Sequence, residues 1–318
     1  MIPFKEKSVI LAPMAGITDS GFRKICIECG ADAVFSEMVS SKGLFYHDKK
    51  SYELLEYSEC ETPISLQIFG SEPECMKVAA EYITENYSPA SIDINMGCPA
   101  PKIFQNGDGS ALMKKPELAF EIISAVKNNT DLPVSVKFRS GIDKDSINAV
   151  DFALMCEQAK ADFITIHGRT REQFYSGRAD IDIIKEVVNA VKIPTVANGD
   201  IIDGESAKHM LEYTGAHSIM IGRAALGNPN IFNEIKSYIF DTKSDTNQEK
   251  LDIALKHLKY TIAEKGEFIA VKEFRKHLMW YMKGIKNAAK LKQLSCKVCS
   301  YADCEDVINT AKAFGLSE

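Results

Sequence analysis

The chain has 318 residues, of which 45% are hydrophobic and 26% charged, and its net charge is −6. This composition is typical of a globular enzyme, and the acidic balance argues against general affinity for nucleic acid. No apolar run is long enough to span a membrane, and the N-terminus lacks the apolar segment of a signal peptide. We therefore expect a cytoplasmic protein, large enough for one α/β barrel with an appendage, whose nine cysteines are reduced thiols.

Short apolar, β-branched runs alternate with helical stretches through the first part of the chain. The runs lie at 9–11, 33–35, 64–68, 92–94, 134–138, 163–166, 194–197 and 218–221, and helices are predicted at 74–86, 116–128, 147–159, 182–191 and 204–213. Nearly continuous apolar strands are typical of a covered parallel sheet. Eight such βα units predict a closed (β/α)8 TIM barrel over residues 1–240. No Gly-x-Gly-x-x-Gly follows the first run, which argues against a Rossmann domain.

The remaining chain, 241–318, is predicted to be a small all-α domain. A polar linker at 241–249 precedes helical patterns at 251–262, 268–286 and 304–314. Residues 1–244 carry 25 basic and 34 acidic side chains, a net charge of −9, whereas residues 245–318 carry 13 basic and 10 acidic ones, a net charge of +3. An acidic body with a local basic strip, here at 272–297, can bind a polyanion.

A cysteine follows the apolar run at 92–94, in the turn Asn95-Met96-Gly97-Cys98-Pro99. Gly97 and Pro99 predict a sharp turn that directs the thiol out of the core, whereas structural cysteines are usually buried as small hydrophobes. Cys98 is therefore a candidate acid, nucleophile or ligand.

Polar residues follow the other predicted strands as well, at the barrel end that holds the active site in this fold. They are Gln67, Lys137, Arg139, His167, Asn198, Gly199, Asp200, Gly222 and Arg223. Each alone is compatible with a solvated loop, but together they favour one functional rim. The glycine turns after the last two strands match the usual phosphate site of this fold.

Flavin mononucleotide (FMN) fits this set best, because Gln67 can meet the N3/O4 edge and Lys137 can stabilise a reduced ring near N1/O2. Pyridoxal phosphate is the alternative, since Lys137 could form a Schiff base. No carboxylate partner for a pyridine nitrogen is evident, which weakens that alternative.

Several motifs, spread over about residues 8–290, resemble those of the tRNA-dihydrouridine synthases, with most likeness to the bacterial DusB-like branch. They are Ala12-Pro13-Met14-Ala15-Gly16-Ile17-Thr18-Asp19, Asn95 to Pro99, His167-Gly168-Arg169-Thr170, Tyr175-Ser176-Gly177-Arg178-Ala179-Asp180, Asn198-Gly199-Asp200-Ile201, Gly222 to Pro229 and Phe274-Arg275-Lys276-His277.

The resemblance implies an FMN-dependent enzyme that uses NADPH to reduce a uridine C5=C6 bond in tRNA. Cys98 matches the general acid that protonates C5 while flavin N5 delivers hydride to C6. The resemblance assigns FMN binding to Pro13, Met14, Ala15, Gln67, Lys137, His167, Asn198, Gly199, Asp200, Gly222 and Arg223. The predicted substrate contacts are Asn95, Arg139, Arg178, Arg275 and Lys276.

The chemistry of the thiol agrees with this role. A cysteine with a pKa near 8.5 can donate a proton at neutral pH, so Cys98 is predicted to be mostly protonated.

Two other functions are compatible with parts of the pattern: an FMN barrel oxidoreductase acting on a small pyrimidine such as dihydroorotate, and a non-catalytic RNA-binding protein. The first leaves the basic strip without a role, and the polar rim argues against the second. No obligate protein partner is evident.

Trp280 and Tyr281 are predicted to be core residues. The Cys296-x-x-Cys299-x4-Cys304 pattern could hold part of a zinc or iron–sulfur site, but no fourth ligand lies nearby in the sequence, so free thiols are favoured.

Overall fold

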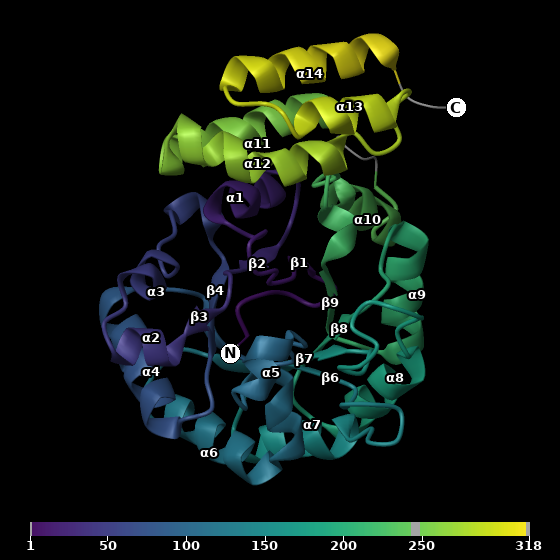
Figure 1. Cartoon of the computed structure of the whole chain (residues 1–318). Helices are drawn as coiled ribbons and strands as arrows, with labels where there is room; N and C mark the ends of the chain where they lie inside the picture. The colour runs from purple at the N-terminus through teal and green to yellow at the C-terminus, as the bar shows by residue number, and fades with distance from the viewer. Residues whose placement is uncertain (1, 243–248, 316–318) are drawn as a thin grey trace.

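The computed structural model describes residues 2–242 and 249–315 and shows a TIM barrel capped at one side by four helices (Figure 1). The strands are β1 (Val9–Leu11), β2 (Ala33–Phe35), β3 (Val39–Ser40), β4 (Ile64–Phe69), β5 (Ser91–Met96), β6 (Val134–Arg139), β7 (Phe163–His167), β8 (Thr195–Asn198) and β9 (Ser218–Ile221). All eight predicted runs form strands, and the parallel β2–β4 and β1–β9 pairings close the barrel. The short β3 pairs only with the end of β4.

Helices surround the sheet. They are α1 (Ser20–Glu28), α2 (Ser41–Phe45), α3 (Lys49–Glu53), α4 (Pro73–Asn86), α5 (Pro101–Gln105), α6 (Pro116–Lys127), α7 (Ala149–Gln158), α8 (Ile181–Ala190), α9 (Gly204–Thr214) and α10 (Ile231–Ile239). The five predicted helices are confirmed to within two residues at either end. Local signals fix their starts: Pro116 opens α6, and the Asp180 carboxylate caps α8 by accepting from the backbone of Ile183.

One end of the barrel interior is filled by apolar side chains. Ile10, Phe35, Phe163 and Met220 form a small inner cluster, and the ring of Phe4 packs edge-on against Phe163 at a centroid distance of 5.1 Å. The N-terminal segment therefore closes one end of the barrel and leaves the polar residues at the strand ends facing the other.

The C-terminal region is all-helical, as predicted, with α11 (Lys250–Lys265), α12 (Glu267–Tyr281), α13 (Ala288–Ser295) and α14 (Tyr301–Phe314). The predicted boundary after residue 240 falls between α10 and α11, and most of the predicted linker lies outside the described residues. The prediction of one helix over 268–286 was wrong, because α12 ends at Tyr281. Gly284 and Asn287, which follow it, have left-handed backbone angles that a continuing helix does not allow. The short α13 was not predicted.

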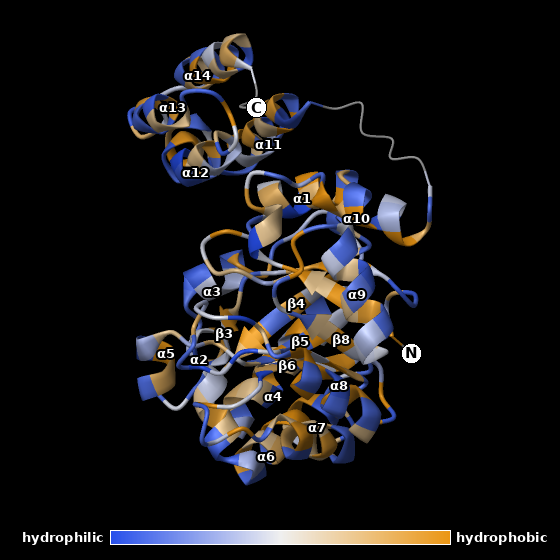
Figure 2. Cartoon of the chain, turned by 90° about the vertical axis from the view of Figure 1, so that its right-hand side faces the viewer, coloured by the Kyte–Doolittle hydropathy of each residue, from blue (hydrophilic) through white to orange (hydrophobic). Residues whose placement is uncertain are grey.

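The C-terminal helices rest on α1 and lie beside α10 (Figures 1 and 2). A Cβ at Gly21 of α1 would lie 2.5 Å from Thr261 Oγ1 of α11, so this glycine permits the close packing. Ion pairs from Lys256 to Glu28 and from Lys265 to Asp19, both at 2.7 Å, add to the interface. Within the described chain, no helix has both the length and the apolarity needed to cross a membrane.

Candidate active site

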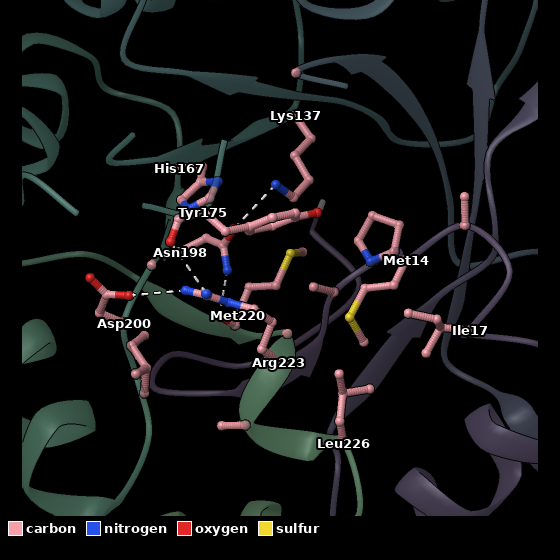
Figure 3. A pocket seen from close by; sticks show the side chains of 18 of the residues that line it. Met14, Ile17, Lys137, His167, Tyr175, Asn198, Asp200, Met220, Arg223 and Leu226 are labelled. Carbon is pink, nitrogen blue, oxygen red and sulfur yellow. Dashed lines mark hydrogen bonds and ion pairs between the residues drawn. The ribbon is translucent and has the colours of Figure 1, made fainter. Parts of the chain in front are cut away.

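A cavity of about 910 Å³ lies at the carboxyl ends of the strands, between the barrel and the C-terminal helices. It brings together fourteen of the predicted site residues: Pro13, Met14, Ala15, Gln67, Asn95, Cys98, Lys137, Arg139, His167, Asn198, Gly199, Asp200, Gly222 and Arg223. Polar side chains from β6 to β9 face Met14, Ile17 and Leu226 across the cavity (Figure 3). A planar ligand with one polar edge suits such a space.

A buried hydrogen-bonded chain crosses three strands beneath the cavity. Asn95 Nδ2 donates to Gln67 Oε1 at 2.8 Å, and Gln67 Nε2 donates to Asp93 Oδ2 at 2.7 Å. Ser135 Oγ donates to the other oxygen of Asp93 at 2.5 Å. Burial raises the pKa of Asp93 to about 7, although both hydrogen bonds oppose the shift. The chain fixes the orientation of the Gln67 amide before any ligand arrives.

Lys137 and His167 supply the cationic and imidazole groups of the cavity. Lys137 Nζ donates to Asn198 Oδ1 at 3.2 Å, and burial lowers its pKa to about 8, with Arg139 acting in the same direction. Burial, together with the nearby cations, lowers the pKa of His167 well below its usual value, so this imidazole is neutral at pH 7. Lys137 therefore holds the positive charge nearest the buried chain.

The Cys98 loop is held by its neighbours on both sides. Asn95 Oδ1 accepts from the backbone N–H of Cys98 at 2.9 Å, and Arg139 Nε donates to the Gly97 carbonyl at 2.9 Å. Burial raises the pKa of Cys98, although Arg139 and Lys137 oppose the shift. The half-buried Cys98 is accordingly a thiol at neutral pH, with two cations close enough to stabilise the thiolate it forms on losing its proton.

The ends of β8 and β9 present backbone donors to the cavity. The backbone N–H groups of Gly199, Gly222 and Arg223 donate to no acceptor within the described residues. Gly199 has a φ of +132°, and a Cβ there would lie 2.6 Å from Ala179 Cβ, so only glycine fits the turn. Free N–H groups beside an arginine are suited to bind a phosphate.

Asp200 organises the same end of the cavity. Its carboxylate accepts from the Ala179 backbone at 2.7 Å and pairs with the buried Arg169 at 2.7 Å and with Arg223 at 3.3 Å. Burial alone would raise the pKa of Asp200, but these donors outweigh it and lower the pKa. Asp200 thus positions Arg223 rather than facing an anion itself.

Tyr175 was not predicted as a site residue, yet its ring lies in the cavity (Figure 3). The guanidinium carbons of Arg223 and Arg139 lie 5.1 and 5.9 Å from the ring centroid, within the range of cation–π contacts. The 171–178 segment that carries Tyr175 is further anchored by Arg169, which donates to the carbonyls of Ser176 and Gly177. The segment forms a half-exposed wall at the mouth.

The C-terminal region adds three more lining residues: Lys250 and Trp280, which were not predicted as site residues, and Lys283, which belongs to the predicted basic strip. Lys250 Nζ donates to the backbone carbonyl of Lys283 at 2.7 Å, and neither lysine forms an ion pair within the described residues. The interpretation of Trp280 as a core residue was wrong, because it is half-buried and faces the cavity, whereas Tyr281 is fully buried.

Three predicted substrate contacts lie away from the cavity. Arg178 is exposed on the 171–178 segment and does not line the cavity. The Arg275 guanidinium donates twice to the Val298 carbonyl, at 2.9 and 2.6 Å, and so holds the α13–α14 connection. Lys276 Nζ donates to the Gly16 carbonyl. The basic pattern of the sequence did not reveal that Arg275 and Lys276 each have an acceptor within the chain.

The three cysteines near the C-terminus differ in their exposure to solvent. Cys296 and Cys299 are exposed, whereas Cys304 is buried in α14. In residues 2–242 and 249–315, no group of three or more His, Cys, Asp or Glu side chains is placed to hold a metal ion.

Comparison with known proteins assigns the family. The family model "Dihydrouridine synthase (Dus)" matches residues 10–314. A tRNA-dihydrouridine synthase B of Vibrio parahaemolyticus is 41% identical over 292 residues, 91% of this chain and 90% of that protein. One from Pasteurella multocida is 41% identical over 288 residues, 88% of this chain and 85% of that protein. A solved DHODH from Eimeria tenella matches with a TM-score of 0.52 at 11% identity, covering 74% of this chain and 80% of that one, a likeness of fold alone.

Proposed function

Because the chain belongs to the dihydrouridine synthase family, we propose that it reduces specific uridines in tRNA to 5,6-dihydrouridine, with FMN as its cofactor and NADPH as the reductant. The observation that carries the proposal is that a protonated thiol, Cys98, lines the same cavity as the polar groups suited to a flavin. Pyridoxal phosphate gains no support from the comparisons, which match dihydrouridine synthases.

The residues present fit FMN. The N–H groups of Gly199, Gly222 and Arg223 would hold its phosphate, and Gln67 and Lys137 would meet the polar edge of its ring. Gln67 is suited to this role because Asp93 and Asn95 each engage one end of its amide, which leaves one N–H and one lone pair free. When bound and reduced, FMN supplies the hydride that adds to uridine C6.

Cys98 would complete the reaction by giving its Sγ proton to C5. Hydride addition at C6 places negative charge on the C5–C4–O4 system of the base, and protonation at C5 neutralises it. The C5–H bond forms as the S–H bond breaks, and the thiolate is left beside Arg139 and Lys137, which stabilise it until it takes a proton from solvent. Asn95, which orients the Cys98 loop, also lies close enough to line the base pocket.

The helical domain, 241–318, would bind the RNA. A uridine inside folded tRNA must be extruded to reach a barrel cavity, and its flanking phosphates then lie at the mouth. Among the described residues of the helical domain, Lys250 and Lys283 are the cations that line the cavity, and Trp280 lines it as well. All groups in this scheme come from one chain, so it requires no protein partner, and its substrate implies a cytoplasmic location.

The test has two stages. We expect the purified protein to be yellow and to release FMN on denaturation, and to form dihydrouridine, detected by mass spectrometry, in tRNA from a strain lacking the gene when NADPH is supplied. Tritium release from 5-tritiated uridine gives the rate. A yellow protein that oxidises dihydroorotate but leaves tRNA unchanged would instead identify a small-molecule oxidoreductase, and a colourless protein would remove the cofactor from the proposal.

A further inference from the structure

The turn after β1 is held by two side chains that come from different parts of the molecule. Gly16 has a left-handed φ of +71°, and the Ile17 N–H donates back to the Met14 carbonyl at 2.9 Å. The Gly16 N–H donates to Glu37 Oε1, and the Gly16 carbonyl accepts from Lys276 Nζ. The peptide groups on both sides of this residue are therefore fixed by side chains rather than by a regular ladder.

These two side chains connect the cavity to the helical domain. Glu37 lies between β2 and β3 and precedes Met38, which lines the cavity. Lys276 lies on α12, and Met14 and Ala15, just before Gly16, line the cavity. A shift of α12 would therefore move the side of the cavity against which a planar cofactor would pack.

Lys276 differs from its neighbour Lys265 in what it binds. Lys265 pairs with two carboxylates, Asp19 at 2.7 Å and Glu273 at 2.6 Å. Lys276 forms no ion pair within the part of the chain that the structure describes, and the Gly16 carbonyl is the acceptor that holds it. The bond to the Gly16 carbonyl holds the half-buried Lys276 side chain against the turn.

We propose that Lys276 is a positioning residue that holds the β1–α1 turn for FMN, and not a contact to the tRNA backbone. The inference rests on the proposed function for the identity of the cofactor. It makes the helical domain part of the cofactor site as well as the RNA-binding surface, because one of its helices sets the position of Met14 and Ala15.

The experiment compares three variants of the full chain. K276M removes the donor, K276R keeps one, and K286M removes the same charge from an exposed site between α12 and α13. FMN dissociation constants are measured by fluorescence quenching on reconstituted apoprotein. We expect K276M to raise the dissociation constant about tenfold, as for loss of one charge-assisted hydrogen bond, and K276R and K286M to stay within about threefold of the unmodified chain.

Binding of tRNA at several salt concentrations provides the second readout. A lysine that neutralises a phosphate contributes about one unit to the slope of log K against log salt, so K276M is expected to keep the slope of the unmodified protein. An unchanged FMN affinity in K276M, or a slope lowered by about one unit without loss of FMN, overturns the inference. An equal loss of FMN in K286M also overturns it, because the effect would then be one of charge or stability; thermal midpoints of all variants identify a general loss of fold. If the unmodified chain binds no FMN, it is the proposed function that fails.

Discussion

The cavity has a barrel wall, formed by residues at the strand ends, and a helical wall, formed by the C-terminal region. The two walls differ in how their polar side chains are held. On the barrel wall, Asn95, Gln67, Asp93 and Ser135 bond to one another, so their geometry is set without a ligand. On the helical wall, Lys250 and Lys283 form no ion pair with a carboxylate in the described part of the chain. The first wall is suited to orient a rigid ring, and the second to receive a flexible polyanion.

The interface between the barrel and the C-terminal helices also differs from the barrel wall in how its buried polar groups are hydrogen-bonded. His257 and His277 pack between α1, α11 and α12, with their ring centroids 4.7 Å apart. Neither nitrogen of His277 has a hydrogen-bond partner within the described residues. The barrel wall thus buries polar groups that satisfy each other, whereas this interface buries the His277 imidazole without a hydrogen-bond partner among the described residues.

The largest expected effect lies on the barrel wall. C98A should lower the rate of uridine reduction by about 10²–10⁴-fold, the usual contribution of a positioned acid, while NADPH still reduces the bound flavin at its normal rate. Stopped-flow bleaching of the flavin and mass spectrometry of tRNA separate the two steps. The exposed Cys60, changed to alanine, is the control. Loss of both steps in C98A would mean that this cysteine has a structural role.

The buried chain gives the second effect. D93A removes the acceptor that orients the Gln67 amide, so the FMN dissociation constant should rise about 10–100-fold. The buried donors of Gln67 and Ser135 that lose their acceptor should also lower the folding stability by about 1–3 kcal/mol. The matched control is S65A, which breaks the buried 2.6 Å Ser65–Ser91 bond that lies outside the cavity. S65A should lower the thermal midpoint without weakening FMN. Equal FMN affinities in D93A and the unmodified chain would show that the Gln67 orientation is not needed.

The third effect concerns the interface and depends on pH. Burial lowers the pKa of His257 to about 4 and that of His277 well below its usual value. Below about pH 6.5 the unfolded chain binds protons that the folded chain does not, so the free energy of unfolding falls on acidification, by about 1.4 kcal/mol per pH unit for each histidine. Asp93, whose pKa is raised by burial, contributes with the opposite sign between about pH 4 and 7.

A variant that lacks one of these histidines isolates its contribution to the pH dependence of the unfolding free energy. H277F keeps a ring in the cluster but cannot titrate, so its unfolding free energy between pH 6.5 and 5 should fall less steeply than that of the unmodified protein. Urea unfolding at each pH measures the slopes. The exposed His209, changed to phenylalanine, is the control for the substitution itself. If H277F has the slope of the unmodified chain, the buried imidazole is not excluded from protonation.

The smallest effect is expected on the helical wall. K250Q combined with K283Q should raise the KM for tRNA several-fold and reduce the salt dependence of binding, because each cation at the mouth contributes little by itself. FMN affinity should not change. K49Q, at an exposed lysine of α3 on the barrel, is the charge control. A fall in kcat at unchanged KM would assign these lysines to the chemical step instead.

The sequence predicted the barrel wall well, because its residues occupy fixed places at the ends of apolar strands, whose order the fold imposes. Asp93 was overlooked although it lies two residues before Asn95, on the inward-facing alternation of the same strand. The helical wall was harder to predict. Whether Trp280 faces a cavity, or Lys276 a carbonyl, depends on how α12 packs on the barrel, and a helical pattern of charges does not specify that packing.

Gly227 limits the distance between the two walls. It follows β9 with a φ of +71°, and a Cβ there would lie 2.4 Å from the Trp280 carbonyl. The backbone of α12 thus lies against the barrel at a point where no side chain intervenes. A side chain at this position would have to displace α12, and with it Trp280, which lines the cavity.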